Sequence, residues 1–100
     1  MKGKAMSDVI EAAVAAMQEK LGEGFDGSAK FVITGEGAVM LDADGVRAGD
    51  EEADVTLTAD VETFRAILDG RLNPTTAFMT GRLAVDGNMG TAMKLGSVLG

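Results

Sequence analysis

The chain has 100 residues, of which 46% are hydrophobic and 25% are charged, and its formal net charge is −7 at pH 7. This length suits one domain with a single core, and no apolar run approaches the roughly 20 residues of a membrane span. We therefore expect no stable membrane insertion. The excess of acids also disfavours nucleic acid as a partner, because phosphate backbones are bound by basic surfaces.

Residue types exclude most catalytic chemistry. The sequence has no His, Cys, Tyr or Trp, so zinc sites of His and Cys are excluded and no Ser or Thr has a recognisable partner base. Asp42 and Asp44 supply two carboxylates before Gly45. They lack the third carboxylate and the downstream Glu spacing of a calcium loop, so a hairpin turn is favoured. We predict that the protein is not an enzyme and has no catalytic residue, metal or cofactor.

The first residues are interpreted as a short leader followed by the start of the domain. Residues 1–5 would be a leader introduced for expression, and a single domain would span residues 6–100. Acids at Asp8, Glu11 and Glu19 interrupt any apolar segment of a secretory signal. Together with the absence of cysteine, this pattern favours a cytoplasmic location.

Hydrophobic periodicity predicts one helix and then a series of strands. Apolar residues recur at helical spacing over residues 8–21, which predicts an amphipathic helix. Segments with a two-residue period predict strands at residues 30–34, 38–42, 46–48 and 54–58. The side chains expected to face the helices are Phe31, Ile33, Val39, Leu41, Val55 and Leu57.

The second half of the chain is predicted to be mostly helical. Asp60 is the expected N-cap of a helix that ends at Leu68, and Asn73 followed by Pro74 predicts a short helix over residues 74–79. A strand at residues 83–86 and a closing helix at residues 89–99, capped by Asn88, complete the chain. This order predicts an α+β fold: a single five-stranded, mainly antiparallel sheet with helices packed over one face.

The last third also carries a family resemblance. It resembles the sterol carrier protein type two domain, a family of lipid carriers with the same order of helix, strand, Gly-Asn-Met-Gly turn and closing helix. Arg82 replaces the usual Lys, and Thr80 stands where the family often has Gln. The residues that carry the resemblance are Asn73, Pro74, Ala77, Phe78, Gly81, Leu83, Gly87, Asn88, Met89, Gly90, Ala92, Met93, Lys94 and Leu95.

A cluster of flexible apolar side chains lies in the same region. On composition alone, Met79, Met89 and Met93 with Phe64 and Phe78 are simply core residues, although thioethers also repack around ligands of different shapes. The resemblance implies an apolar tunnel between the sheet and the C-terminal helices. The predicted wall comprises Phe31, Ile33, Phe64, Ile67, Leu68, Phe78, Met79, Leu83, Met89 and Met93.

The resemblance implies a non-catalytic intracellular carrier of an apolar or amphipathic lipid. The ligand would be a fatty acid, a fatty acyl-CoA, a sterol-like lipid or an isoprenoid. Thr80, Arg82 and Asn88 are the candidate polar anchors. The first N–H groups of a helix capped by Asn88 can receive an anionic head group, although a capped turn is the simpler interpretation.

Two further expectations concern how the apolar face is covered. An empty rigid tunnel of about 300 Å³ would cost on the order of 7 kcal/mol at roughly 24 cal/mol per Å³, comparable to the stability of a small domain. We therefore expect the closing helix to collapse partly or the protein to retain a lipid from its expression host. The alternative function is an interaction or accessory module, in which a partner chain, or a second copy in a homodimer, closes the same face.

Overall fold

The structure is a computed structural model that describes residues 8–21 and 24–99; the predicted leader at residues 1–5 lies outside these residues. Strand ends differ from the sequence-based expectation by one residue, and the helices at both ends of the chain agree with it. The elements are α1 (Asp8–Leu21), β1 (Ala29–Ile33), β2 (Gly37–Asp42), β3 (Gly45–Ala48), β4 (Val55–Ala59), α2 (Val61–Leu68), α3 (Pro74–Met79), β5 (Ala84–Gly87) and α4 (Met89–Leu99).

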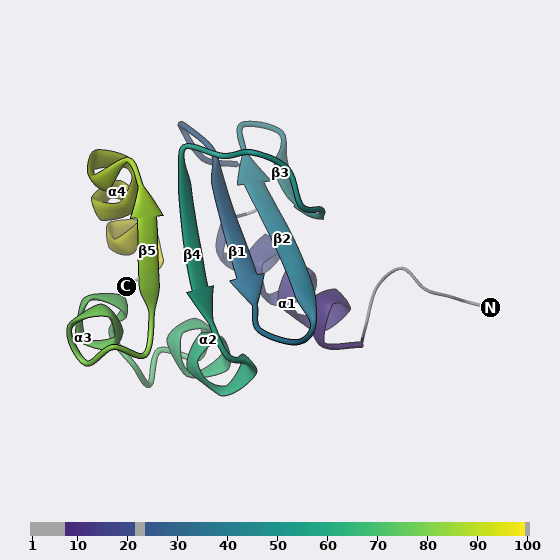
Figure 1. The fold of residues 1–100 in the computed structure, drawn as a ribbon. Coiled ribbons are helices and arrows are strands. Elements are labelled where there is room, and N and C mark those ends of the chain that lie inside the picture. Colours follow the sequence, from purple (N-terminus) through teal and green to yellow (C-terminus); the bar gives the residue numbers. More distant parts are fainter. Residues whose placement is uncertain (1–7, 22–23, 100) are drawn as a thin grey trace.

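The five strands form one sheet in the order β3-β2-β1-β4-β5 (Figure 1). Three of the four strand pairs are antiparallel, and β1 pairs with β4 in parallel. The hairpin of β2 and β3 lies on one side of β1, so the chain crosses back to place β4 on the other side. The predicted α+β fold with a mainly antiparallel sheet is confirmed.

The core lies between one face of the sheet and the helices. Burial alternates along β1 and β4, and the register places Phe31 opposite both Val39 and Leu57. All six side chains predicted to face the helices are buried. They form one cluster with residues of all four helices, and Figure 1 shows α1 behind the sheet. The helical members of this cluster are Ile10, Met17, Leu21, Phe64, Ile67, Ala77 and Leu95.

Helix α2 is fixed at its start by the predicted cap and at its centre by an aromatic contact. The side chain of Asp60 accepts a hydrogen bond from the Thr63 backbone N–H at 2.8 Å. Hydrogen bonds from the side chain and backbone of Thr63 lower the pKa of Asp60. The ring of Phe64 meets that of Phe31 edge to face, with centroids 5.8 Å apart. This contact ties α2 to the middle of the sheet.

The turn between β5 and α4 is tied to the start of β4. Gly87 has φ of +114°, and a Cβ there would collide with the Asp54 carbonyl oxygen and lie 3.0 Å from the Val55 Cα. The N–H of Asn88 donates to the same Asp54 oxygen at 2.8 Å. Its side-chain oxygen accepts from the Thr91 N–H at 2.9 Å, which caps α4. This turn therefore sets where α4 begins.

Replacement of Gly87 tests the importance of this close approach. We expect Gly87→Ala to lower the free energy of unfolding by roughly 3 kcal/mol, because a positive φ and a backbone collision add together. Gly35→Ala is the matched control: φ there is +81°, but nothing lies within 4 Å of the added Cβ. It should cost only about 1 kcal/mol. Urea denaturation measures both, and equal losses would show that the approach to Asp54 is unimportant.

Candidate functional site

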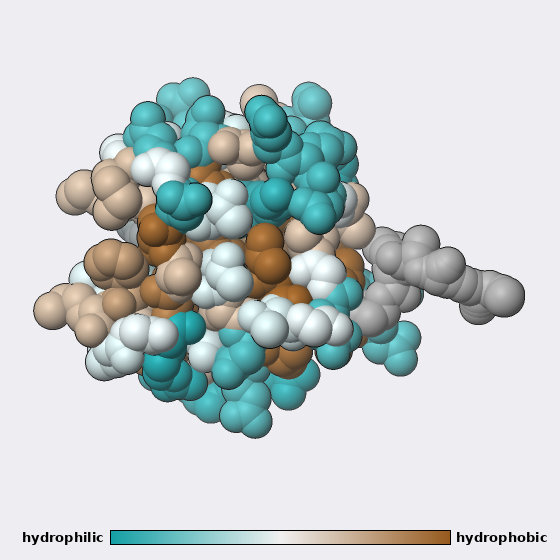
Figure 2. Space-filling view, viewed as in Figure 1, coloured by the Kyte–Doolittle hydropathy of each residue, from teal (hydrophilic) through white to brown (hydrophobic). Residues whose placement is uncertain are grey.

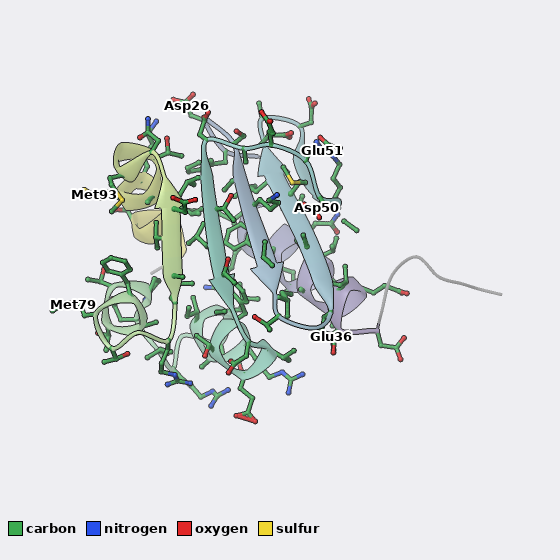
Figure 3. The ribbon with its side chains drawn as sticks, viewed as in Figure 1. Asp26, Glu36, Asp50, Glu51, Met79 and Met93 are labelled. Carbon is green, nitrogen blue, oxygen red and sulfur yellow. The ribbon has the colours of Figure 1, made fainter. Side chains whose placement is uncertain are left out.

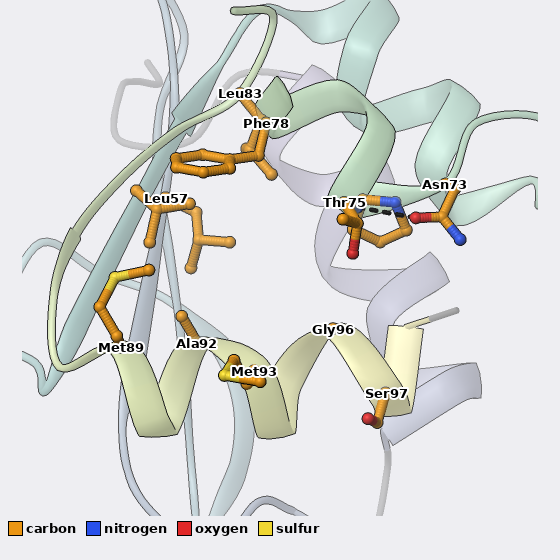
Figure 4. A pocket seen from close by; sticks show the side chains of 12 residues that line it. Leu57, Asn73, Thr75, Phe78, Leu83, Met89, Ala92, Met93, Gly96 and Ser97 are labelled. Atoms are coloured by element: carbon orange, nitrogen blue, oxygen red, sulfur yellow. Dashed lines mark hydrogen bonds between the residues drawn. The ribbon is translucent and has the colours of Figure 1, made fainter. Parts of the chain in front are cut away.

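An uncharged groove with a volume of about 590 Å³ lies between α3 and α4 (Figure 4). Helix α3 forms one wall, α4 forms the other, and side chains of β4 and β5 lie beneath them. Its lining residues are Leu57, Asn73, Pro74, Thr75, Phe78, Leu83, Val85, Met89, Ala92, Met93, Gly96 and Ser97.

The base of the groove is buried, whereas its rim is exposed. Leu57 and Leu83 are each 4% exposed and belong to the hydrophobic core. Phe78, Met89 and Met93 line the groove while remaining 46%, 52% and 73% exposed. The base is thus held by the fold, and the rim side chains are free to change rotamer around a ligand.

Helix α3 is held in place by its two ends. The Asn73 side chain accepts hydrogen bonds from the N–H groups of Thr75 (2.8 Å) and Thr76 (3.4 Å), and Pro74 occupies the first turn. After the helix ends, the N–H groups of Arg82 and Leu83 both donate to the carbonyl oxygen of residue 77, at 2.9 and 3.0 Å. The α3 wall of the groove is therefore defined by the chain's own hydrogen bonds.

The groove has an apolar end and a polar end. In Figure 4, Leu57, Phe78 and Met89 gather at one end, whereas Thr75 and Ser97 lie toward the other. All of the lining residues are uncharged. A long apolar molecule with a small polar group matches this distribution, because its polar group can meet hydroxyls while its chain contacts carbon.

The ten predicted wall residues are divided among several places. Four of them line the groove: Phe78, Leu83, Met89 and Met93. Ile33, Phe64 and Leu68 instead border a smaller cavity of about 230 Å³ between α1 and α2. Phe31 and Ile67 are buried in the core, and Met79 is exposed to solvent.

None of the three candidate polar anchors lines the groove. The hydroxyl of Thr80 donates to the carbonyl oxygen of Thr76 at 2.9 Å, closing the end of α3. Asn88 caps α4. Arg82 faces a different pocket. The polar groups that do line the groove are Asn73, Thr75 and Ser97.

Arg82 belongs to a pocket of about 390 Å³ whose other lining residues include Arg65 and Arg71. Acids accompany these guanidinium groups: Glu62 lines the same pocket, and a carboxylate oxygen of Asp69 lies 3.2 Å from Arg71. The cluster is consequently close to charge balance, and we assign it no ligand.

For several groove residues, nothing in the sequence indicates that they belong to a site. Leu57 was expected only in the core, and the contributions of Gly96 and Ser97 depend on which side of α4 turns toward α3. Thr75 resembles any residue in the first turn of a helix. Phe78, Leu83, Met89 and Met93 are the lining residues that the sequence analysis predicted for the wall; Pro74, Val85 and Ala92 are also apolar and lie in the same segment, but were not predicted.

Two other kinds of site were sought in residues 8–21 and 24–99. No group of three or more Asp, Glu, His or Cys side chains there is arranged to hold a metal ion. Within the same ranges, no helix combines the length and apolar character needed to cross a bilayer. The groove between α3 and α4 is the feature on which a functional assignment rests.

Comparison with known proteins identifies the family. The model of the SCP-2 sterol transfer family matches residues 8–100. Hydroxysteroid dehydrogenase-like protein 2 of Xenopus laevis is 31% identical over 103 residues, covering 95% of this chain. The chain spans only 25% of the length of that relative. The chain belongs to the SCP-2 sterol transfer family.

Solved structures share the fold. The sterol carrier protein domain 2 of Helicoverpa armigera has a TM-score of 0.71 and 30% identity, covering 97% of this chain and 92% of its own. A sterol carrier protein 2 of Aedes aegypti, solved in complex with palmitate, has a TM-score of 0.74 and 23% identity, covering 94% and 96% respectively. These matches agree with the five-stranded α+β architecture.

The cap of α3 offers a test of how the groove wall is held. We expect Asn73→Ala to lower the free energy of unfolding by about 1 kcal/mol, because two N–H groups lose their acceptor. Asn73→Asp should retain most of the stability, since a carboxylate oxygen accepts the same bonds. Thermal unfolding of the three proteins measures the effect. Equal stability of wild type and Asn73→Ala would show that the cap does not hold α3.

Proposed function

We propose that the groove between α3 and α4 binds a lipid and that the domain carries this lipid without chemically altering it. The observation that carries the proposal is the uncharged lining, in which buried Leu57 and Leu83 lie beneath flexible Phe78, Met89 and Met93. Burial of apolar ligand surface stabilises a complex by about 25 cal/mol per Å² before the costs of association. Such a wall selects for apolar area rather than for one molecular shape.

Family membership supports this assignment. The matched family is described as one of sterol transfer, and the Aedes aegypti relative of the same fold was solved with palmitate. For this chain we favour a lipid with a single long apolar part, such as a fatty acid or a sterol-like molecule. Fatty acyl-CoA and isoprenoids share the same apolar requirement. A cytoplasmic location stays a prediction.

The polarity of the groove orients the ligand. We place the apolar chain beside Leu57, Phe78 and Met89, and the polar group toward Thr75 and Ser97. Hydroxyl groups donate and accept hydrogen bonds, so they suit both an alcohol and a carboxylate head group. Water at the open rim solvates the remaining polar atoms.

The open shape also removes the energetic difficulty of an empty tunnel. The cost of about 24 cal/mol per Å³ applies to closed cavities that stay dry. The rim here is exposed, so water enters when no lipid is bound. Binding then replaces this water with hydrocarbon.

Gly96 allows the groove to be filled without damage to the fold. It lines the groove within α4, and a Cβ built on it has nothing within 4 Å. We expect Gly96→Phe to weaken binding of a fluorescent fatty acid by at least about tenfold, which corresponds to about 1.4 kcal/mol. Gly96→Ala is the matched control. It should retain lipid affinity and raise helix stability by up to about 1 kcal/mol.

Fluorescence titration and thermal unfolding of both variants separate occlusion from unfolding. A stable Gly96→Phe protein with the affinity of wild type would remove the groove as the binding site. Mass spectrometry of denatured protein supplies an independent readout, because lipid retained from the expression host should be present in wild type and depleted in Gly96→Phe.

The absence of charge in the groove lining gives a second prediction. A fatty acid and the fatty alcohol of equal length should bind with affinities within about fivefold, since no cation among the lining residues favours the carboxylate. Competition against one fluorescent probe at low and high salt measures the ratio. A preference above about fiftyfold for the acid, lost at high salt, would instead place the head group near a basic side chain.

The second candidate is an accessory role within a larger assembly. The chain matches only a quarter of the length of its Xenopus laevis relative, so related domains occur within longer proteins. Sedimentation with and without fatty acid separates the two functions. A stable dimer or hetero-complex with no lipid response favours the accessory module, whereas a monomer with a lipid-dependent melting temperature favours the carrier.

A further inference from the structure

Reversible oxidation of this protein is limited to methionine. The sequence has seven methionines and no cysteine, and these two residue types are the ones whose oxidation cells can reverse. Oxidation turns the apolar thioether of methionine into a polar sulfoxide. A peroxide must reach the sulfur atom to do so, and the consequence depends on what that sulfur contacts. The place of each methionine in the fold therefore decides its role.

The methionines of residues 8–21 and 24–99 fall into three groups. Met17 and Met40 are 3% and 2% exposed, so the surrounding side chains shield their sulfur atoms. Met79 is 78% exposed and does not line the groove. Met89 and Met93 are 52% and 73% exposed and do line it. Figure 3 shows Met79 and Met93 projecting outward from α3 and α4, and Figure 2 shows apolar residues protruding on the same side.

The two groove methionines lie on one face of α4. They are four residues apart, a spacing that makes side chains neighbours on a helix. In Figure 4, the side chain of Met89 points toward Leu57 and Phe78 at the apolar end of the groove. Neither of these neighbouring side chains has a hydrogen-bond donor. The sulfur of Met89 is thus reachable by solvent but faces hydrocarbon across the groove.

We propose that Met89 and Met93 are oxidation sites, at which hydrogen peroxide forms sulfoxides that lower the affinity of the groove for lipid. The sulfur lone pair attacks one peroxide oxygen, and the O–O bond breaks as the S–O bond forms. The released hydroxide takes the proton from the sulfur-bound oxygen and becomes water. Sulfur loses two electrons, and the peroxide gains them. This inference rests on the proposed function, because the sulfoxides act on the bound lipid.

A sulfoxide at these positions affects the complex rather than the fold. In the free protein both side chains are exposed, so water solvates the new oxygen and the core is untouched. A bound lipid displaces this water and leaves the oxygen against hydrocarbon, and a polar group buried without a partner is costly. By linkage, a bound lipid also hinders oxidation of the same sulfur atoms.

The modification is reversible. A methionine sulfoxide reductase restores the thioether with a thiol reductant. Two thiols become a disulfide, and the sulfoxide oxygen leaves as water. Because the chain has no cysteine, the thiol reductant acts on the sulfoxides without breaking any disulfide of the protein. Oxidation then favours lipid release, and reduction favours lipid retention.

Treatment with hydrogen peroxide, with and without fatty acid, tests the assignment. Peptide mass spectrometry should find oxidation at Met79, Met89 and Met93, whereas Met17 and Met40 are spared. Saturating fatty acid should slow oxidation of Met89 and Met93 by about fivefold and leave Met79 unchanged, because only the groove is covered. Treated wild type should bind a fluorescent fatty acid about tenfold more weakly. Methionine sulfoxide reductase with dithiothreitol should restore the affinity.

Leucine variants assign the effect to the groove, each compared with its own untreated form. The double variant Met89→Leu, Met93→Leu should change in affinity by less than about twofold on treatment, because no sulfur remains in the groove lining. Met79→Leu is the matched control and should lose affinity as wild type does. Equal losses in the double variant and in wild type would overturn the inference, as would equal protection of all three methionines by fatty acid.

The outcomes distinguish this inference from the proposed function. Untreated protein that binds fatty acid, together with oxidised protein of the same affinity, would overturn the inference alone. Untreated protein that binds no fatty acid would refute the proposed function, and the inference with it. Circular dichroism supplies the remaining control: oxidised protein that has unfolded would show that the sulfoxides act on the fold, which also overturns the inference.

Discussion

The position of α4 depends on one carbonyl oxygen, that of Asp54 at the start of β4. This oxygen accepts a hydrogen bond from the Asn88 N–H. Gly87, which precedes Asn88, lets the backbone of the turn approach the backbone of Asp54 closely. The strand that lines the base of the groove is therefore joined directly to the helix that forms its wall. The base and the α4 wall cannot separate at this end unless the turn breaks. The opposite wall is set independently, by the hydrogen bonds at the two ends of α3.

The fold was largely predictable because it follows from short-range patterns. Helical spacing predicted α1 over residues 8–21, and the Asn73-Pro74 pair predicted the start of α3. Both predictions agree with the structure. Strands were displaced by one residue, as in β1, because pairing with neighbouring strands sets their ends. Local sequence contains no information about that pairing. Met40 shows the same limit: it is buried, although the two-residue period places it on the face away from the helices.

The candidate site was less predictable, because apolar residues of core and groove look alike in sequence. Phe31 and Phe64 were expected in the wall, but they pack against each other inside the domain. Their role depends on how α2 crosses the sheet, which no local pattern specifies. Thr75 and Ser97 line the same groove only because α3 and α4 face each other. Membership in the SCP-2 family identifies the fold, whereas packing against neighbouring elements sets the direction of each side chain.

The sparse anchoring of α4 has a consequence for which molecules fit. Among its described side chains, Leu95 alone is fully buried, whereas α1 buries Ile10, Met17 and Leu21. Gly90 and Gly96 further reduce the intrinsic preference of α4 for the helical state. Local opening of α4 therefore costs less free energy than opening of α1. In the proposed lipid site, α4 would therefore yield to guests of different width more readily than the sheet beneath it.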